Sequence, residues 1–312
     1  MRGWEFDRPV PKRGYAWWYV DALSDDGAHG ITLIAFIGTV FSPWYALARR
    51  AQGGTGGDPE DHVCLNVALY GRPRRWAMTD RRRPALDRGP NHLAIGPSRL
   101  DWDVDALVIT IEETTAPIPS RISGTVTLRP QALSTRTFQL DADGRHRWFP
   151  IAARSRVEVM LRHPELSWSG PAYFDTNEGS APLEQDFVQW DWCRAPMRDA
   201  SAVLYNAERR DGSRQSLALR IGADGAVEDI EPPQPVELPR TLWRIGRPTR
   251  AEGGDAQVVR TLEDTPFYSR SVIRTRLLGQ QATAVHESLS LDRFRSPAMF
   301  AMLPFKVPRP FR

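Results

Sequence analysis

Two short segments carry an ionisable side chain beside an aromatic one, at a spacing that could support acid catalysis. On an extended strand, the segment DGRHRWFP would place His146 and Trp148 on one face, because side chains alternate with a period of two. The same rule places Tyr173 and Asp175 on one face of the segment GPAYFDTNEG. Each segment therefore combines a group that can exchange a proton with an aromatic ring.

Such a combination suits acid chemistry on a hydrocarbon. An aromatic-lined setting disfavours a carboxylate and raises the pKa of an aspartic acid above about 3.9, so the acid keeps its proton near neutral pH. Aromatic faces also attract a developing cation. Spacing alone leaves a purely structural interpretation open, with His146 in an exposed turn, Trp148 in the core and Asp175 capping a turn in DTNEG.

Other candidate sites have less support. Trp190 and Trp192 in the segment WDW share a strand face and could line a substrate pocket, although aromatic residues at this spacing usually belong to a core. The remaining histidines show neither H-x-H nor H-E-x-x-H spacing, and Cys64 and Cys193 are far apart. We therefore expect no metal site.

The elements that must position these residues are β-strands. β-Branched and aromatic residues, bounded by Gly, Pro or Asp, predict strands over residues 31–41, 62–70, 106–113, 121–128, 156–160, 186–193, 201–208, 215–221, 257–263, 271–278 and 283–291. One short helix is predicted over 43–51. The pattern favours an all-β chain of two tandem antiparallel barrels or sandwiches. The segment RHPELSWSGP suggests a boundary that gives domains 1–165 and 166–312, with the two aromatic pairs on either side of it.

Composition limits the class of protein. The chain has 312 residues, 41% hydrophobic and 25% charged, which is ordinary for a globular protein that folds in water. A net charge of +3, well mixed with acidic residues, is too small for a nucleic-acid partner. The N-terminal segment has no secretory signal pattern, and the longest apolar stretch, 31–45, is shorter than the roughly 20 residues needed to cross a bilayer.

Four longer motifs resemble the carotenoid 1,2-hydratases, also called hydroxyneurosporene synthases. They are GYAWWYVDALSDDG, DGRHRWFPIA, TLEDTPFYSRS and VHESLSLDRF, and they recur in order over nearly the whole chain. The resemblance implies a pair of lipocalin-like β-barrel domains and a cofactor-independent hydration of acyclic carotenoids such as neurosporene and lycopene. It also implies four residues needed for activity, which fall here on His146, Trp148, Tyr173 and Asp175.

The resemblance leads to a mechanistic hypothesis. Protonated Asp175 would protonate C2 of the terminal C1=C2 double bond, and water would capture the tertiary cation at C1. Trp148 and Tyr173 would stabilise the cation, while His146 would hold Asp175 or orient and deprotonate the water. Because the two pairs flank the predicted boundary, we expect the site where the two domains meet.

The expected partners are an acyclic carotenoid, water and a membrane surface. We expect a cytoplasmic protein at the periphery of the inner or intracytoplasmic membrane, docked through strand 31–41 or through Phe305 and Phe311. Two alternatives stay open: a lipocalin-like carrier that binds a carotenoid or lipid without chemistry, and an enzyme of related fold acting on another isoprenoid alkene. The sequence does not determine the oligomeric state.

Overall fold

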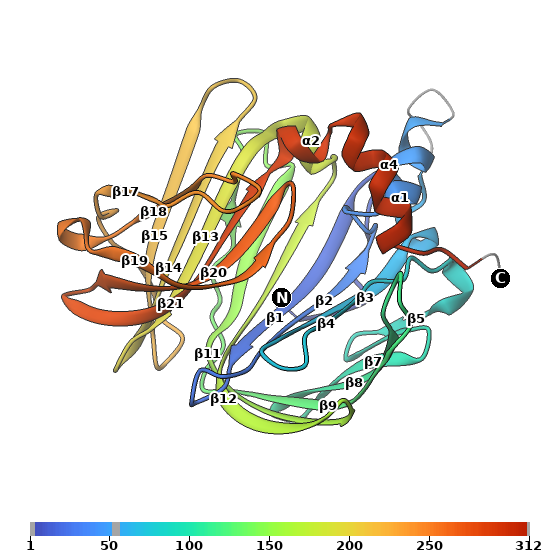
Figure 1. Ribbon diagram of the computed structural model, residues 1–312, viewed down its shortest axis with the longest axis horizontal. Helices are drawn as coiled ribbons and strands as arrows, with labels where there is room; N and C mark the ends of the chain where they lie inside the picture. Colours follow the sequence, from blue (N-terminus) through green and yellow to red (C-terminus); the bar gives the residue numbers. More distant parts are fainter. Residues whose placement is uncertain (1–3, 52–56, 311–312) are drawn as a thin grey trace. The chain divides into compact units, whose positions relative to one another are not determined.

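The computed structural model describes residues 4–51 and 57–310, and β-strands dominate it (Figure 1). The strands are β1 Tyr15–Leu23, β2 Gly30–Ile37, β3 Val63–Tyr70, β4 Arg75–Ala77, β5 Leu86–Gly89, β6 His92–Ile95, β7 Ser98–Asp103, β8 Ala106–Thr114, β9 Arg121–Pro130, β10 Phe138–Gln139, β11 His146–His163, β12 Glu165–Gly179, β13 Phe187–Pro196, β14 Ala200–Arg209, β15 Arg214–Gly222, β16 Val227–Asp229, β17 Pro235–Leu238, β18 Arg247–Arg250, β19 Ala256–Asp264, β20 Tyr268–Leu277 and β21 Gln280–Ser290. The helices are α1 Pro43–Arg50, α2 Leu183–Asp186, α3 Leu291–Phe294 and α4 Pro297–Lys306, with short 3-10 turns η2 Pro59–Asp61, η3 Arg83–Ala85 and η4 Glu252–Gly254.

The all-β prediction is confirmed. Each strand predicted from the sequence is present, and the predicted helix over 43–51 is α1. Two longer strands, β1 and β12, lie outside the predicted strand ranges, as do the short strands β4, β5, β6, β7, β10, β16, β17 and β18. β1 is buried along almost its whole length and lacks the alternation of apolar and polar residues that marks a half-exposed strand. β12 begins directly after Pro164, and this proline-containing stretch has the composition of a linker.

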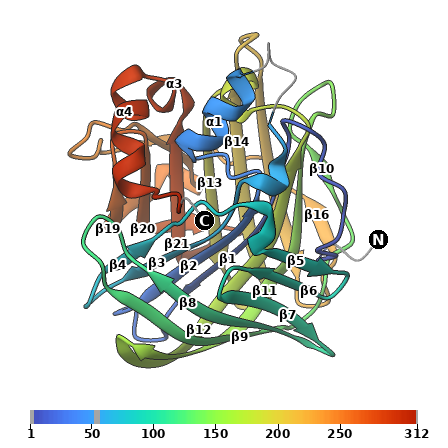
Figure 2. The same ribbon diagram turned by 90° about the vertical axis from the view of Figure 1, so that its right-hand side faces the viewer.

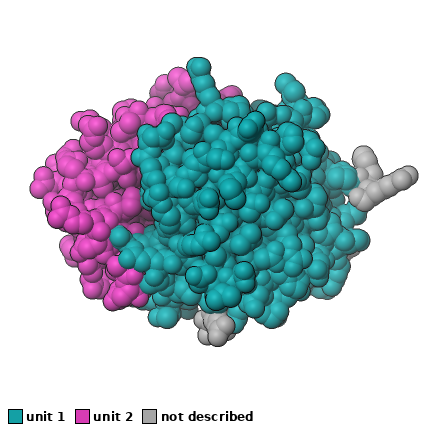
Figure 3. Space-filling view, turned by 90° about the horizontal axis from the view of Figure 1, so that it is seen from below, with its two compact units in different colours: residues 1–182, 301–312 teal, residues 183–300 magenta. Residues whose placement is uncertain are grey.

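Two compact units divide the chain: residues 1–182 with 301–312, and residues 183–300 (Figure 3). The predicted boundary at 165/166 is therefore wrong. It falls in the turn between β11 and β12, which pair with each other along most of their length and belong to the same sheet. A long two-stranded pairing keeps both strands in one unit, so the division comes after β12 instead.

The first unit is built on one large antiparallel sheet with strand order β4-β3-β2-β1-β12-β11-β9-β8-β7-β6-β5. This sheet curls (Figures 1 and 2) and encloses an apolar core. Trp18, Leu33, Ile109 and Phe174 are among the core residues and are no more than 1% exposed. A curled antiparallel sheet around such a core is the lipocalin-like arrangement that the resemblance implied.

The second unit has its own sheet, with strand order β16-β15-β14-β13-β21-β20-β19, and a small separate β17-β18 pair. Its apolar core includes Cys193, Leu204, Ile273 and Leu277. Hence each unit encloses a hydrophobic core of its own.

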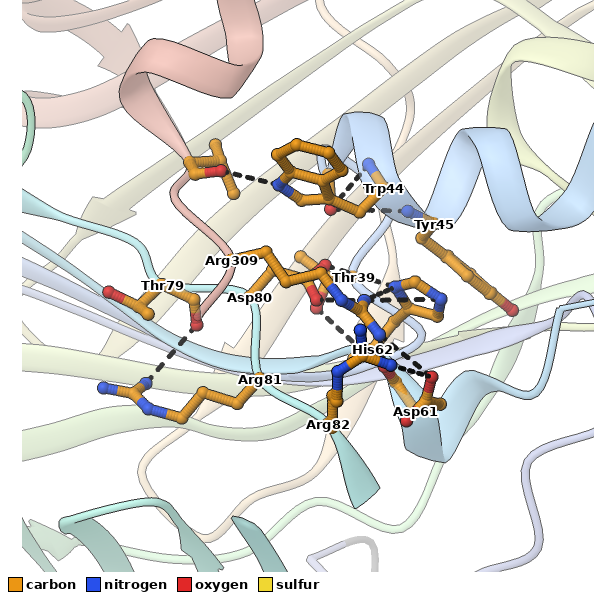
Figure 4. Close-up of polar contacts among 12 residues, drawn as sticks. Thr39, Trp44, Tyr45, Asp61, His62, Thr79, Asp80, Arg81, Arg82 and Arg309 are labelled. Atoms are coloured by element: carbon orange, nitrogen blue, oxygen red, sulfur yellow. Dashed lines mark hydrogen bonds and ion pairs between the residues drawn. The ribbon is translucent and has the colours of Figure 1, made fainter. Parts of the chain in front are cut away.

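Val307 and Arg309, which follow α4, contact the N-terminal part of the first unit (Figure 4). The Arg309 guanidinium donates to Asp80 Oδ1 at 2.6 Å and to Asp61 Oδ2 at 2.9 Å, and it also contacts the His62 ring. The Trp44 indole nitrogen of α1 donates to the carbonyl oxygen of Val307 at 2.8 Å. The side chain of Asp80 is fully buried, so Arg309 supplies the counter-charge for a buried carboxylate.

Candidate active site

The four residues implied by the resemblance lie on two adjacent strands of the first unit. His146 and Trp148 begin β11, Tyr173 and Asp175 lie in β12, and the antiparallel register brings these strand ends together. The side chains share one face of the sheet. His146, Trp148 and Tyr173 are 0% exposed and Asp175 is 4% exposed, so the interpretation of His146 as an exposed turn residue is wrong.

This face is opposite to the apolar core of the first unit. Phe174, which lies between Tyr173 and Asp175, points into that core, as does Trp18 of the neighbouring strand β1. The sheet is therefore buried on both faces at β1 and β12. All four candidate residues belong to one unit, so the expectation that the two predicted domains contribute one pair each is wrong.

Asp175 accepts two hydrogen bonds on the same carboxyl oxygen. The Trp148 indole N–H donates to Oδ2 at 2.8 Å, and the Tyr173 hydroxyl donates to Oδ2 at 2.9 Å. Burial, together with the adjacent Asp175 carboxyl group, raises the pKa of Tyr173 well above its usual value near 10. The Tyr173 phenol therefore stays protonated at physiological pH and remains a hydrogen-bond donor to Asp175.

Aromatic rings surround this carboxyl group. Tyr19 of β1 is the register partner of Asp175, and its ring meets the Tyr173 ring edge to face, with centroids 6.3 Å apart. On the other side, Phe138 lies 5.3 Å from the Trp148 ring. The setting thus provides π faces near an acid, which is the arrangement expected to stabilise a carbocation.

His146 is held at both its backbone and its side chain. Its backbone N–H donates to Asp141 Oδ1 at 2.7 Å, and Asp141 also accepts from the backbone N–H of Arg145 at 3.2 Å. This aspartate closes the turn that leads into β11, where Gly144 has φ +65°, a conformation that favours glycine. The His146 Nδ1 atom lies 2.8 Å from the Tyr15 hydroxyl.

The strand β1 also contributes to this site, which the sequence did not predict. Tyr15, Trp17 and Tyr19 alternate along β1 on the face that carries Asp175, and the Tyr15 and Trp17 rings stack with centroids 4.8 Å apart. Asp21, 0% exposed, continues the same face. The alternation of aromatic residues in YAWWYVDAL was the available signal, but only strand pairing shows which strand it faces.

Trp190 and Trp192 lie on β13 of the second unit. They share a strand face, as their spacing predicted, and are 7% and 5% exposed. Trp190 packs edge to face against Phe187 and Tyr205, with centroids 5.9 Å away in each case. These contacts within the second unit fit the core interpretation, and a role in substrate binding stays a prediction.

Within residues 4–51 and 57–310, no group of three or more His, Cys, Asp or Glu side chains is arranged to hold a metal ion. None of the helices in the same ranges is long and apolar enough to span a membrane.

Known hydratases resemble this chain closely. It is 55% identical over 311 residues to an acyclic carotenoid 1,2-hydratase from Thiocapsa roseopersicina, covering 99% of this chain and 76% of the relative. It is 50% identical over 308 residues to the enzyme of that name from Rubrivivax gelatinosus, covering 97% and 75%.

Solved structures support the fold. A structure of an AttH protein from Nitrosomonas europaea superposes with a TM-score of 0.58 at 16% identity, covering 88% of this chain and 92% of that one. Kievitone hydratase from Nectria haematococca gives a TM-score of 0.54 at 9% identity, covering 91% and 92%. The model of the family described as carotenoid hydratase CrtC matches residues 33–312. With this match and these relatives, the chain belongs to the carotenoid hydratase family.

Proposed function

We propose that this chain is an acyclic carotenoid 1,2-hydratase, which adds water across the terminal C1=C2 double bond of its substrate. The observation that carries the proposal is the buried carboxyl group of Asp175, held by Trp148 and Tyr173 among aromatic rings. The relatives named acyclic carotenoid 1,2-hydratase give the substrate class. The reaction is redox-neutral and requires only a proton donor, a surface that stabilises a cation, and water.

Asp175 is the proton donor in this proposal. Burial disfavours a charged carboxylate, and a neutral carboxyl group can accept two hydrogen bonds on its carbonyl oxygen. Because Oδ2 accepts from both Trp148 and Tyr173, we assign the transferable proton to Oδ1. That proton forms the new C–H bond at C2 and leaves a tertiary cation at C1. The π electrons of C1=C2 form the bond, and Asp175 becomes a carboxylate.

Water then completes the reaction. Its oxygen attacks C1, and His146 takes the released proton and returns it to the Asp175 carboxylate, so the enzyme is restored after one addition of water. The rings of Trp148, Tyr173 and Tyr19 would stabilise the cation before capture. No cofactor takes part in this sequence of proton transfers.

A direct assay tests the function. Purified protein is mixed with liposomes that contain lycopene or neurosporene, and products are analysed by mass for a gain of one water. We expect hydration by the wild type and a loss of roughly 1,000-fold or more in Asp175→Asn, because general acid catalysis contributes about 10²–10⁴-fold. Normal hydration by a folded Asp175→Asn variant would contradict the acid assignment. Binding without any product would favour the carrier alternative.

A matched control is available in the second unit. Asp191 is also buried, accepts hydrogen bonds from Ser288 and Gln189, and has its pKa raised by burial to about 8. A neutral Asp191 closely resembles asparagine in shape, so Asp191→Asn should keep both the fold and the hydration activity.

We also propose that the protein docks on the membrane that holds its substrate. Leu47 of α1 and Met302 and Phe305 of α4 are 47%, 50% and 73% exposed. Each of these helices also carries an exposed cation, Arg50 in α1 and Lys306 in α4. Exposed apolar side chains with adjacent basic groups suit insertion into an anionic lipid surface. We call these five residues the α1/α4 patch.

The sequence predicted docking through strand 31–41 or through Phe305 and Phe311, and the α1/α4 patch retains only Phe305 of these. Of the segment 31–41, residues 31–37 lie in the buried strand β2 and are not available for docking. Phe305 is exposed as required, whereas Phe311 lies outside the described residues.

Vesicle flotation tests the docking. The wild type should float with anionic vesicles at low salt, and a Met302→Ser/Phe305→Ser variant should lose most of this binding. Leu242→Ser is the control, because Leu242 is 97% exposed but lies outside the α1/α4 patch. Equal flotation of the wild type and the double variant would reject this patch as the docking surface.

A further inference from the structure

The side chains of Tyr15 and His146 meet across a glycine. In the sheet, β12 lies between β1 and β11, and Gly179 of β12 is the register partner of both Tyr15 and His146. The two partner residues are therefore separated by a whole strand. Nevertheless, the Tyr15 hydroxyl and His146 Nδ1 are 2.8 Å apart, and both residues are 0% exposed.

Gly179 makes this contact possible. A Cβ atom at position 179 would lie 2.5 Å from Cε1 of the Tyr15 ring and 2.8 Å from His146 Nδ1. Both distances are far below van der Waals contact, so any side chain here would push the two groups apart. Gly179 is not among the residues with positive φ, so the requirement is for space rather than for an unusual backbone conformation.

A hydroxyl group on Nδ1 has a chemical consequence for the imidazole. Neutral histidine carries one proton, and a hydrogen bond at one nitrogen selects which nitrogen holds it. When Nδ1–H donates to the Tyr15 oxygen, Nε2 has the lone pair needed to accept a proton. When Tyr15 donates to Nδ1, Nε2 carries the proton instead. Protonated imidazole donates from both nitrogens, and the Tyr15 oxygen can accept one of these bonds.

We propose that Tyr15 is a positioning residue for His146: its hydroxyl, reaching across Gly179, holds the imidazole with Nδ1 protonated so that Nε2 exchanges the proton of the reacting water. This inference rests on the proposed function, because it deepens the role of His146 in that reaction. Tyr15 itself does not contact the substrate in this scheme. The backbone bond from His146 to Asp141 fixes the strand end, and the Tyr15 bond fixes the ring.

Tyr15→Phe tests the proposal, because it removes the hydroxyl and keeps the ring that stacks on Trp17. We expect kcat to fall roughly 10- to 1,000-fold with little change in KM, since a histidine in the wrong tautomer is a poor base. In the protein without substrate, the ¹⁵N chemical shifts of the His146 ring should move toward the other tautomer. The pH profile of kcat should change as well.

Tyr45→Phe is the matched control. Tyr45 is a fully buried tyrosine of the same unit, and its hydroxyl donates to the Gly14 carbonyl oxygen at 2.6 Å. Loss of this bond should lower stability as much as Tyr15→Phe does, while kcat and the His146 nitrogen signals stay as in the wild type. If the loss of any buried hydroxyl group lowered activity, kcat would fall equally in Tyr15→Phe and Tyr45→Phe.

The following outcomes would overturn or support the positioning role of Tyr15. A Tyr15→Phe variant with wild-type kcat, or with unchanged His146 ring signals, overturns the proposal. If Tyr15→Phe folds poorly, Tyr15→Leu and Gly179→Ala can be used, because both disturb the same contact. The ¹⁵N chemical shifts of the His146 ring must then move in the same direction in these two variants. Failure of the wild type to hydrate carotenoids contradicts the proposed function instead, and the ring signals then still report whether Tyr15 selects the tautomer.

Discussion

The Trp148 indole nitrogen donates a hydrogen bond to Oδ2 of Asp175 at 2.8 Å, and the two residues, 27 positions apart in sequence, lie on the paired strands β11 and β12. This bond shows that the two aromatic-plus-ionisable segments form one cluster rather than two. It also fixes which carboxyl oxygen is used as an acceptor.

Trp148→Phe should lower hydration activity by roughly 10-fold or more. The change keeps an aromatic face but removes one of the two donors that orient Asp175, and a hydrogen bond of this kind contributes about 1–2 kcal/mol. Initial rates with carotenoid liposomes measure the effect. Trp4→Phe serves as the control, because the Trp4 indole nitrogen points to Asn91, 3.5 Å away. Equal rates for Trp148→Phe and the wild type would contradict the role of this donor.

Gly179→Ala should reduce both activity and stability. The added methyl group would lie within 3 Å of Tyr15 and His146, and overpacking of this kind costs about 1–3 kcal/mol. Thermal unfolding and initial rates are the measurements, and we expect a rate at least 10-fold lower, by analogy with the loss of a general base. Gly246→Ala is the control, since nothing lies within 4 Å of a Cβ built there. Similar behaviour of the two variants would show that position 179 is not crowded in solution.

The contribution of Asp191 to the stability of the protein should fall as pH rises between about 4 and about 8. Burial raises the pKa of this residue from 3.8 to about 8 in the folded protein. Over that range the folded state holds a proton that the unfolded state has lost, so a higher pH favours unfolding. Above pH 8 this contribution is constant.

Thermal unfolding of the wild type and Asp191→Asn at pH 5 and pH 8 checks this prediction. The difference in Tm between wild type and variant should shift in favour of Asp191→Asn at the higher pH. His286 contributes with the opposite sign, because burial lowers its pKa from 6.5 to about 4, and its effect is confined to pH values below about 6.5. An identical pH dependence in wild type and Asp191→Asn would argue against a neutral Asp191.

Arg309→Ala should destabilise the protein by about 3 kcal/mol, because it leaves the buried carboxylate of Asp80 without its counter-charge. Urea or thermal unfolding measures the change. Arg156→Ala is a suitable comparison: Arg156 also pairs with an aspartate, Asp25, but both side chains are more than half exposed, and such pairs contribute about 0–1 kcal/mol. Equal effects of the two substitutions would mean that the Arg309 contact does not persist in solution.

The sequence by itself determined the local features of this protein. Period-two alternation predicted that His146 would share a face with Trp148 and Tyr173 with Asp175, and the structure has both pairs arranged so. β-Branched and aromatic runs predicted most long strands, and long motifs indicated the family, whose model matches residues 33–312. These features depend on residues that are close in the chain, so their signal is present in short segments.

Only the tertiary structure decided how distant segments meet. The pairing of β1 with β12 brings Tyr15 to His146, 131 residues away, and no local pattern specifies that pairing. Register depends on long-range packing of both faces of the sheet, and a slip of one residue would turn every side chain of a strand to the other face. For the same reason a proline-containing turn resembled a domain boundary, although the strands on its two sides pair with each other in one sheet.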